Sequence, residues 1–278
     1  MLVNGYGNSA LHTICKAMYR VVWSIEPGSS EECIEELLNS GLDPNMQNNR
    51  GETPLHIATE SRLLNIVKIL LDRGADVSAR TNEGLTALHV AGDSEESEDG
   101  KYNPATELIK LLLLKSMDVN AADADGLTPL HYAPDRKTFE ILLENGANIN
   151  AEDNEGSTPL YFAILLDATD VVESLLNRGI DLTARFREGT SPIHLAADCS
   201  SNTLELLCHR AQRLGIDIDC LDASGGTPLF NALVYSIPHD CRTARFLLKI
   251  GSKLDNVFWI DKRTRDWFST KPQSSVYW

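Results

Sequence analysis

The sequence predicts an all-α repeat protein: a solenoid of seven helix-turn-helix units with loop or β-turn fingers, followed by a non-repeat C-terminal tail. Three observations predict it. A five-residue motif recurs seven times, a pair of leucines and a glycine follows most copies, and the spacing of the copies centres on 33 residues. A period of this length is typical of stacked repeat architectures.

The motif places Thr or Ser, in most copies followed by Pro, before a short apolar segment. Its copies are NSALH (8–12), ETPLH (52–56), LTALH (85–89), LTPLH (127–131), STPLY (157–161), TSPIH (190–194) and GTPLF (226–230). The Thr or Ser positions are 44, 33, 42, 30, 33 and 36 residues apart. The variation predicts local insertions in the first and third units and a deletion in the fourth.

Each copy of the motif predicts the start of a short first helix. The Thr or Ser hydroxyl is suited to cap free N–H groups, and Pro is suited to the first helical turn. An alanine follows on one side of this helix, at Ala58, Ala91, Ala133, Ala163, Ala196 and Ala232.

A second helix is predicted to end at a Leu pair followed by a glycine that takes a positive φ. These endings are LLNSG (37–41), LLDRG (70–74), LLENG (142–146), LLNRG (175–179) and LLKIG (247–251). The third unit has Ser116 in place of the glycine, so we expect a looser helix end there.

The motif T-P-L-H-x-A at this period, with endings such as GADVSA (74–79) and GANINA (146–151), resembles the ankyrin repeat family over about residues 4–255. The resemblance implies a curved stack of helix pairs in which neighbours share their stability. It also implies that the motif histidine ties adjacent turns by hydrogen bonds, at His12, His56, His89, His131 and His194. Tyr161 and Phe230 replace this histidine in the fifth and seventh units.

The predicted domain organisation is a repeat domain, 1–255, and a basic, aromatic tail or cap, 256–278. The predicted repeats are about 4–47, 48–80, 81–122, 123–152, 153–185, 186–221 and 222–255. In the first repeat the helix is expected to break at Pro27-Gly28 and to restart at Ser29. In the third, Asn103-Pro104 is expected to restart the second helix.

Two segments depart most from the repeat pattern. Five acids lie within residues 93–99, which predicts a solvated loop or, alternatively, an acidic flap that binds a basic peptide. The tail holds six aromatic residues, which is too many for ordinary disorder. It is expected to cover the last repeat, to lie in the chain's own acidic groove, or to dock a partner.

Composition and charge exclude several function classes. The formal net charge is −15, of which residues 241–278 carry +5 and residues 1–240 therefore −20, so binding of nucleic acid is not expected. The longest apolar runs are too short for a membrane span. The N-terminus lacks the pattern of a signal peptide, and six scattered Cys without C-x-x-C spacing indicate reduced thiols. We expect an intracellular protein, cytoplasmic or nuclear.

The sequence predicts a non-catalytic protein with no cofactor and no metal site. His239-Asp240-Cys241 is the tightest cluster, and one His with one Cys cannot close a zinc site. As an alternative, a small-molecule-binding or catalytic protein would use acids and a tyrosine at the ends of the first helices. These residues are Asp93, Asp135, Asp198, Cys199 and Tyr235.

The main hypothesis is a protein-protein interaction module that holds a partner segment in its concave groove. The positions that the resemblance implies are Asn49, Arg50, Glu52, Glu60, Asn82, Glu83, Leu85, Asp125, Leu127, Asp135, Arg136, Asn154, Glu155, Leu165, Leu166, Arg187, Glu188, Asp198, Val234 and Tyr235. The earlier repeats present mainly acids and amides, and the later ones add apolar residues, Phe186 among them. We therefore expect a partner with a basic part and an apolar anchor.

A third hypothesis is a structural piece of a larger, multidomain protein that self-associates through its first repeat. The first predicted finger begins only three residues into the chain. The molecule itself is expected to be a monomer or to self-associate weakly.

Overall fold

The computed structural model describes residues 3–21, 29–91, 104–133, 135–186, 189–199, 201–234 and 242–253. In this part of the chain the secondary structure is helix and turn, with no strand, so the predicted all-α class is confirmed. The chain divides into two compact blocks, Met1–Phe162 and Ala163–Trp278. They are called the N-terminal block and the C-terminal block below.

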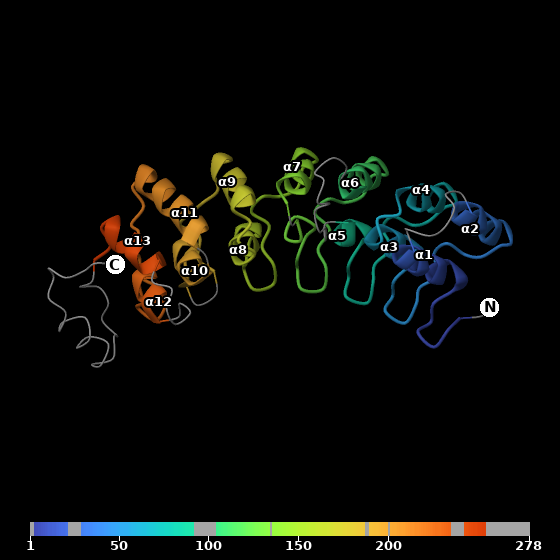
Figure 1. The fold of residues 1–278 in the computed structure, drawn as a ribbon, viewed down its shortest axis with the longest axis horizontal. Helices are drawn as coiled ribbons and strands as arrows, with labels where there is room; N and C mark the ends of the chain where they lie inside the picture. The colour runs from blue at the N-terminus through green and yellow to red at the C-terminus, as the bar shows by residue number, and fades with distance from the viewer. Residues whose placement is uncertain are drawn as a thin grey trace. The chain divides into compact units, whose positions relative to one another are not determined.

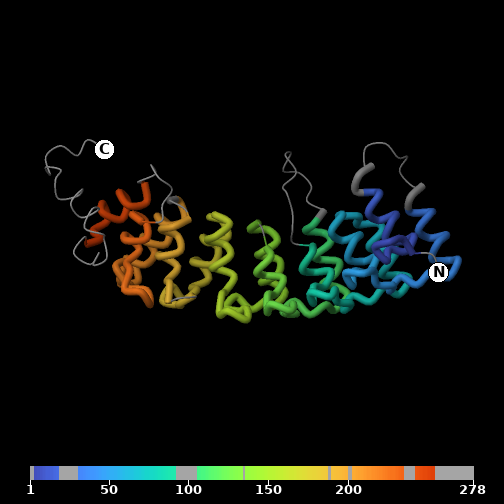
Figure 2. The backbone as a smooth tube through the Cα atoms, turned by 90° about the horizontal axis from the view of Figure 1, so that it is seen from below, coloured from blue at the N-terminus to red at the C-terminus, as the bar shows by residue number. Residues whose placement is uncertain are grey.

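The N-terminal block stacks helix pairs in chain order (Figure 1, Figure 2). One layer consists of the first helices, which pack side by side, and a second layer of helices packs on it. The first layer is α1 (Ala10–Val21), α3 (Pro54–Glu60) and α5 (Ala87–Ala91); the second is α2 (Ser29–Asn39), α4 (Leu64–Asp72), α6 (Pro104–Leu114) and α7 (Arg136–Glu144). Ala58 and Ala91 are buried between the layers, where a small side chain permits close helix packing.

The C-terminal block repeats this arrangement. Its helices are α9 (Thr169–Asn177), α10 (Pro192–Cys199), α11 (Ser201–Leu214), α12 (Pro228–Val234) and α13 (Arg242–Lys249), and α8 (Pro159–Leu165) spans the division between the blocks. α10 packs against α12, and α11 packs against both α9 and α13. Leu175, Leu207 and Leu247 from the three second helices are fully buried.

Apart from the fourth predicted repeat, the helix starts predicted by the motif agree with the structure. Thr53 has the extended conformation of an N-cap residue, with φ −94° and ψ 165°, and Pro54 opens α3. α2 begins at Ser29 and α6 at Pro104, as predicted. Pro27-Gly28 and Asn103 lie outside the described residues, as do the acidic run 93–99 and the tail 256–278, so the roles predicted for them stay predictions.

The end of the third predicted repeat differs from the expectation. The glycines of the other predicted endings, Gly41, Gly74, Gly146, Gly179 and Gly251, have φ between 78° and 105°. Ser116 has φ 65°, and its N–H donates to the carbonyl of Leu113 at 3.0 Å. The helix end is therefore as closed as the others, because Ser116 takes the same left-handed conformation despite its Cβ atom.

The first helix predicted in the fourth repeat does not form as an α-helix. Residues 129–132 make turns in which the N–H groups of His131 and Tyr132 donate to carbonyls three residues back, those of Thr128 and Pro129. The sequence explains the difference, since Pro134 lies two residues after Tyr132 and disfavours a helical conformation at Ala133.

Candidate functional site

The loops that precede the first helices, called fingers here, are joined by backbone hydrogen bonds in the N-terminal block. The N–H group near each finger tip donates to a carbonyl of the preceding finger: Asn49 to Tyr6 at 3.1 Å, and Asn82 to Arg50, Ala124 to Glu83 and Asn154 to Asp125 at 2.9 Å each. Glycines with positive φ make this approach possible. A Cβ atom on Gly84 would lie 2.8 Å from the nitrogen of Ala124.

Three asparagines predicted as contact residues take part in this finger stack. The amides of Asn82 and Asn154 donate to the carbonyls of Asn49 and Ala124 at 3.0 Å, and the Asn49 amide donates to Gly5 at 3.3 Å. These amides therefore hold the fingers in register.

The motif histidines form a second connection between neighbours, as the resemblance implied. In five repeats Nδ1 lies 2.8–3.0 Å from the hydroxyl of the motif Thr or Ser. Nε2 lies 2.9–3.4 Å from a backbone carbonyl of the next finger, at Glu52, Leu85, Leu127, Ser157 and Gly226. Because a carbonyl only accepts, Nε2 carries the proton and Nδ1 is an acceptor.

This geometry refines the predicted cap. The hydroxyl of Thr53 and its backbone N–H both lie within hydrogen-bond distance of Nδ1 of His56. The predicted bond from a helix N–H to the hydroxyl occurs at Thr227, which accepts from Phe230 at 3.2 Å, and at Ser191, which accepts from His194 at 3.3 Å. Burial lowers the pKa of all five imidazoles, those of His12, His56, His89, His131 and His194. The histidines are therefore neutral at neutral pH, and their role is to join neighbouring fingers.

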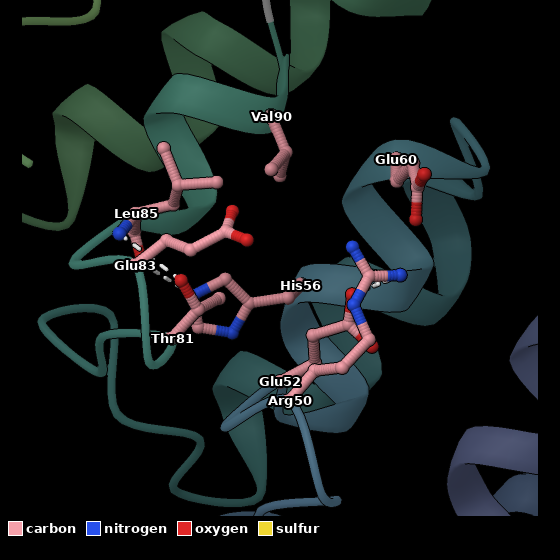
Figure 3. A pocket seen from close by; sticks show the side chains of 8 residues that line it. All are labelled: Arg50, Glu52, His56, Glu60, Thr81, Glu83, Leu85 and Val90. Carbon is pink, nitrogen blue, oxygen red and sulfur yellow. Dashed lines mark hydrogen bonds and ion pairs between the residues drawn. The ribbon is translucent and has the colours of Figure 1, made fainter. Parts of the chain in front are cut away.

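A pocket of about 130 Å³ lies between the second and third fingers and the helices α3 and α5 (Figure 3). Its lining includes five residues predicted as contacts: Arg50, Glu52, Glu60, Glu83 and Leu85. His56, Thr81 and Val90 complete the wall. The fingers and the first helices thus bring together residues from two neighbouring repeats.

The pocket combines negative charge with an apolar wall. Arg50 and Glu52 form an ion pair of 3.4 Å. The carboxylates of Glu60 and Glu83 are exposed and make no ion pair with any described residue. Leu85 and Val90 are half-buried, and Figure 3 shows the side chains of Glu83, Arg50 and Val90 around the same space. Two unpaired carboxylates beside apolar surface suit a cationic side chain with an aliphatic stem.

The other predicted contacts of the N-terminal block lie outside this pocket. Asp125 and Glu155 are exposed on fingers, and the Leu127 carbonyl accepts from His89 at 3.2 Å. Asp135 caps α7, since its carboxylate accepts from the N–H and the hydroxyl of Thr138 at 2.9 Å. Arg136 lies 4.0 Å from Glu140 on the same helix. Asp135 therefore has a structural task.

In the C-terminal block the predicted apolar surface is partly present. Leu165, Leu166 and Val234 are 44%, 64% and 47% exposed. Phe186 was expected on this surface and is instead buried, because it lies at the base of a finger whose turn is closed by its N–H bond to Thr190. Arg187, Glu188 and Tyr235 lie outside the described residues.

Of the residues that the alternative hypothesis names, the structure describes Asp135, Asp198 and Cys199. Asp198 accepts from the amide of Asn231 at 3.5 Å, and partial burial raises its pKa to about 6. Burial also raises the pKa of the neighbouring Cys199 thiol, so that thiol is not activated. Asp135 belongs to the other block, and Asp93, Tyr235 and the cluster His239-Asp240-Cys241 are not described.

His56, Thr81 and Val90 were not predicted to line the pocket. Val90 could have been predicted from the sequence, since it directly follows the motif histidine of α5. It is half-buried, whereas the other four residues of α5 are buried. Within the described residues, no three His, Cys, Asp or Glu side chains come together in a way that would hold a metal ion. Nor does that part of the chain contain a helix long and apolar enough to span a membrane.

Comparison with known proteins gives two findings. A family model described as ankyrin repeats (3 copies) matches residues 2–79, 21–102 and 99–186. Among solved structures, the chain is similar to the ankyrin repeat domain of Bcl-3, described as a unique member of the IkappaB protein family. The sequence identity is 27%, the match covers 87% of this chain and 99% of that one, and the TM-score is 0.58. No curated protein matches the chain.

Proposed function

The chain belongs to the ankyrin repeat family, and from this premise we propose that it is a non-catalytic protein-binding module. Its N-terminal block would hold a segment of a partner protein against the fingers and the first helices. The observation that carries the proposal is the pocket between the second and third fingers, where Glu60 and Glu83 lie beside Leu85 and Val90 and have no ion-pair partner among the described residues. The partner chemistry that fits is an Arg or Lys side chain next to an apolar residue.

The charge of the pocket supports this choice of ligand. Glu52 is already paired with Arg50, so a ligand cation gains most from Glu60 and Glu83. Both are exposed, and surface charge of this kind contributes to the rate of association and to specificity more than to affinity. The apolar wall then supplies the desolvated contact that a binding hot spot needs.

The exposed Leu165, Leu166 and Val234 support a second, separate contact surface in the C-terminal block. Asp125, Leu127, Arg136, Glu155 and Asp198 are proposed as peripheral contacts. Asn49, Asn82 and Asn154 would contribute by holding the finger tips in place. Asp135 would contribute through the start of α7.

The test is a selection of peptides from a randomised displayed library on the full chain, followed by affinity measurement of the enriched peptides. We expect enrichment of Arg or Lys beside an apolar residue. The double variant Glu60→Gln/Glu83→Gln, which keeps the shape of both side chains, should weaken these peptides about tenfold. Glu144→Gln is the matched control, because Glu144 is an exposed acid at the end of α7, in the second helix layer.

Enriched peptides without basic residues, or peptides that bind the double variant and the wild type equally well, would contradict the assignment to this pocket. Weakened binding by Leu166→Ser alone would move the site to the C-terminal block.

A further inference from the structure

One position in the fingers links neighbouring repeats through an asparagine side chain. The carbonyl oxygen of Asn45 accepts from the N–H of Asp76 at 2.7 Å, and its amide donates to the carbonyl of Gly74 at 3.0 Å. Asn120 makes the same pair of bonds, from Asn148 at 2.7 Å and to Gly146 at 3.0 Å. Each asparagine therefore satisfies one donor and one acceptor at the end of the following helix.

The last link of this type has an aspartate in place of the asparagine. Oδ2 of Asp219 accepts from the N–H of Lys253 at 3.0 Å, which reproduces the first of the two bonds, since Lys253 follows Gly251 by two residues. A carboxylate cannot make the second bond, because it has no N–H to give to the carbonyl of Gly251.

The consequence is a buried carboxylate with one oxygen that has no hydrogen-bond donor among the described residues. Asp219 is 8% exposed, and its Oδ1 has no hydrogen-bond partner among the described residues. Ser252, next to the residue that Asp219 binds, is 7% exposed, and its hydroxyl oxygen is also without a partner there. Buried polar groups in folded proteins are almost always paired, so these oxygens indicate a missing donor.

Three exposed leucines lie close to this site in the sequence. Leu221, two residues after Asp219, is 55% exposed, and Leu248 on α13 is 39% exposed. Leu214 at the end of α11 is 56% exposed, and the nearby Gln212 amide reaches the carbonyl of Ile250 at 3.3 Å. The sixth and seventh predicted repeats thus both contribute buried acceptors and exposed leucines here.

The chain itself continues from this point. Residues 254–278 begin directly after Lys253. They contain three of the four tryptophans of the chain, and Lys262, Arg263, Arg265 and Lys271. Indole, ammonium and guanidinium groups are donors and never acceptors, and aromatic rings cover apolar surface.

We propose that residues 254–278 pack where the sixth and seventh predicted repeats meet, cover Leu221 and Leu248, and donate hydrogen bonds to Asp219 and Ser252. Because Asp219 replaces an asparagine, its free carboxylate oxygen needs a hydrogen-bond donor that the repeats do not supply. Residues 254–278 provide this donor. The proposal concerns the end of the stack, and it is independent of the pocket in the N-terminal block.

The test is limited trypsin digestion of the full chain, with cleavage after Lys262, Arg263 and Arg265 followed by mass spectrometry. A synthetic peptide of residues 254–278 is the reference for an undocked tail. We expect the full chain to be cut in this segment at least about tenfold more slowly than the peptide. Asp219→Asn should remove most of the protection, because hydrogen bonds to a charged group are worth about a factor of ten or more.

A matched exchange in the other block, Asn45→Asp, alters the same type of link and should leave tail cleavage unchanged. Circular dichroism of each variant confirms that the helices remain, and Ser252→Ala provides a milder change at the same site. Tail cleavage as fast as in the free peptide would overturn the proposal, as would equal protection in Asp219→Asn and the wild type. Protection that appears only at high protein concentration would assign the surface to a second copy of the chain and also overturn it.

Discussion

The N-terminal and C-terminal blocks share one repeat motif and differ in the side chains that join neighbouring repeats. In the N-terminal block His12, His56, His89 and His131 each bind the next finger, and asparagines link the helix ends. The C-terminal block has one such histidine, His194, and uses Asp219 where the other block uses asparagine. The motif therefore determines the helix pairs, while the junction residues determine how firmly neighbours are joined and what a free end can accept.

The largest expected effect is a loss of stability in acid, concentrated in the N-terminal block. Burial lowers the pKa of the five motif histidines, so their contribution to stability is complete above the unfolded-state pKa of about 6.5 and is lost as the pH falls through the lowered folded-state values. Each histidine that takes up a proton on unfolding adds about 1.4 kcal/mol per pH unit to the slope.

Hydrogen exchange followed by mass spectrometry between neutral pH and pH 5 measures this loss separately in the two halves of the chain. Finger peptides of the N-terminal block, which carries four of the five histidines, should lose protection before those around Gly226. The variant His56→Phe introduces the residue type that the seventh predicted repeat has at Phe230. It should lower the slope of the free energy of unfolding against pH by the contribution of one proton. Simultaneous loss of protection in both blocks would contradict the comparison.

A smaller effect is expected when one finger contact is broken. Gly84 has φ 82°, and a Cβ atom there would lie 2.8 Å from the Ala124 nitrogen. Gly84→Ala should lower the free energy of unfolding by about 3 kcal/mol, from backbone strain of roughly 1–2 kcal/mol plus the steric clash. Gly146→Ala is the control: φ is 90°, but no heavy atom lies within 4 Å of the added Cβ. Urea unfolding that gives equal losses for the two variants would show that the finger stack contributes nothing beyond local strain.

The smallest effect concerns Ser116, which has a left-handed conformation that favours glycine. Ser116→Gly should raise the free energy of unfolding by about 1 kcal/mol, because it removes the Cβ strain at an exposed position. Thermal unfolding measures the change, and Ser40→Gly, one residue before Gly41 in the first repeat, should be destabilising or neutral. A loss of stability in Ser116→Gly would show that the left-handed conformation of Ser116 is not strained.

Much of the fold could be predicted because each repeat is encoded locally. A cap residue followed by proline predicted the starts of α3 and α6. A Leu pair before a glycine predicted the ends of α4 and α9. Two predictions were wrong because a second constraint opposed the repeat pattern. Pro134 prevented a helix that the motif in the fourth repeat predicted, and the fold imposed on Ser116 a conformation that its own residue type does not favour.

The candidate site was predicted only in part. Alignment to the motif found Arg50, Glu52, Glu60, Glu83 and Leu85, because finger tips and first helices recur at fixed offsets. It did not distinguish these residues from Asn82 or Asp135, whose side chains are engaged in hydrogen bonds that hold the scaffold. Equivalent positions of the repeat can hold a side chain that faces solvent in one copy and a side chain that bonds to the scaffold in another, so the motif alone does not separate the two.

The sequence by itself determined the architecture, since a period near 33 residues with caps and terminal glycines can bury its apolar faces only by stacking. The tertiary structure decided which polar residues are used up by that stacking and which stay available. That division depends on distances between repeats: 2.9 Å from the N–H of Asn82 to the preceding finger, and no partner within the described chain for Oδ1 of Asp219. Hydrogen-bond satisfaction is a property of neighbours in space, so it appears only once the repeats are placed side by side.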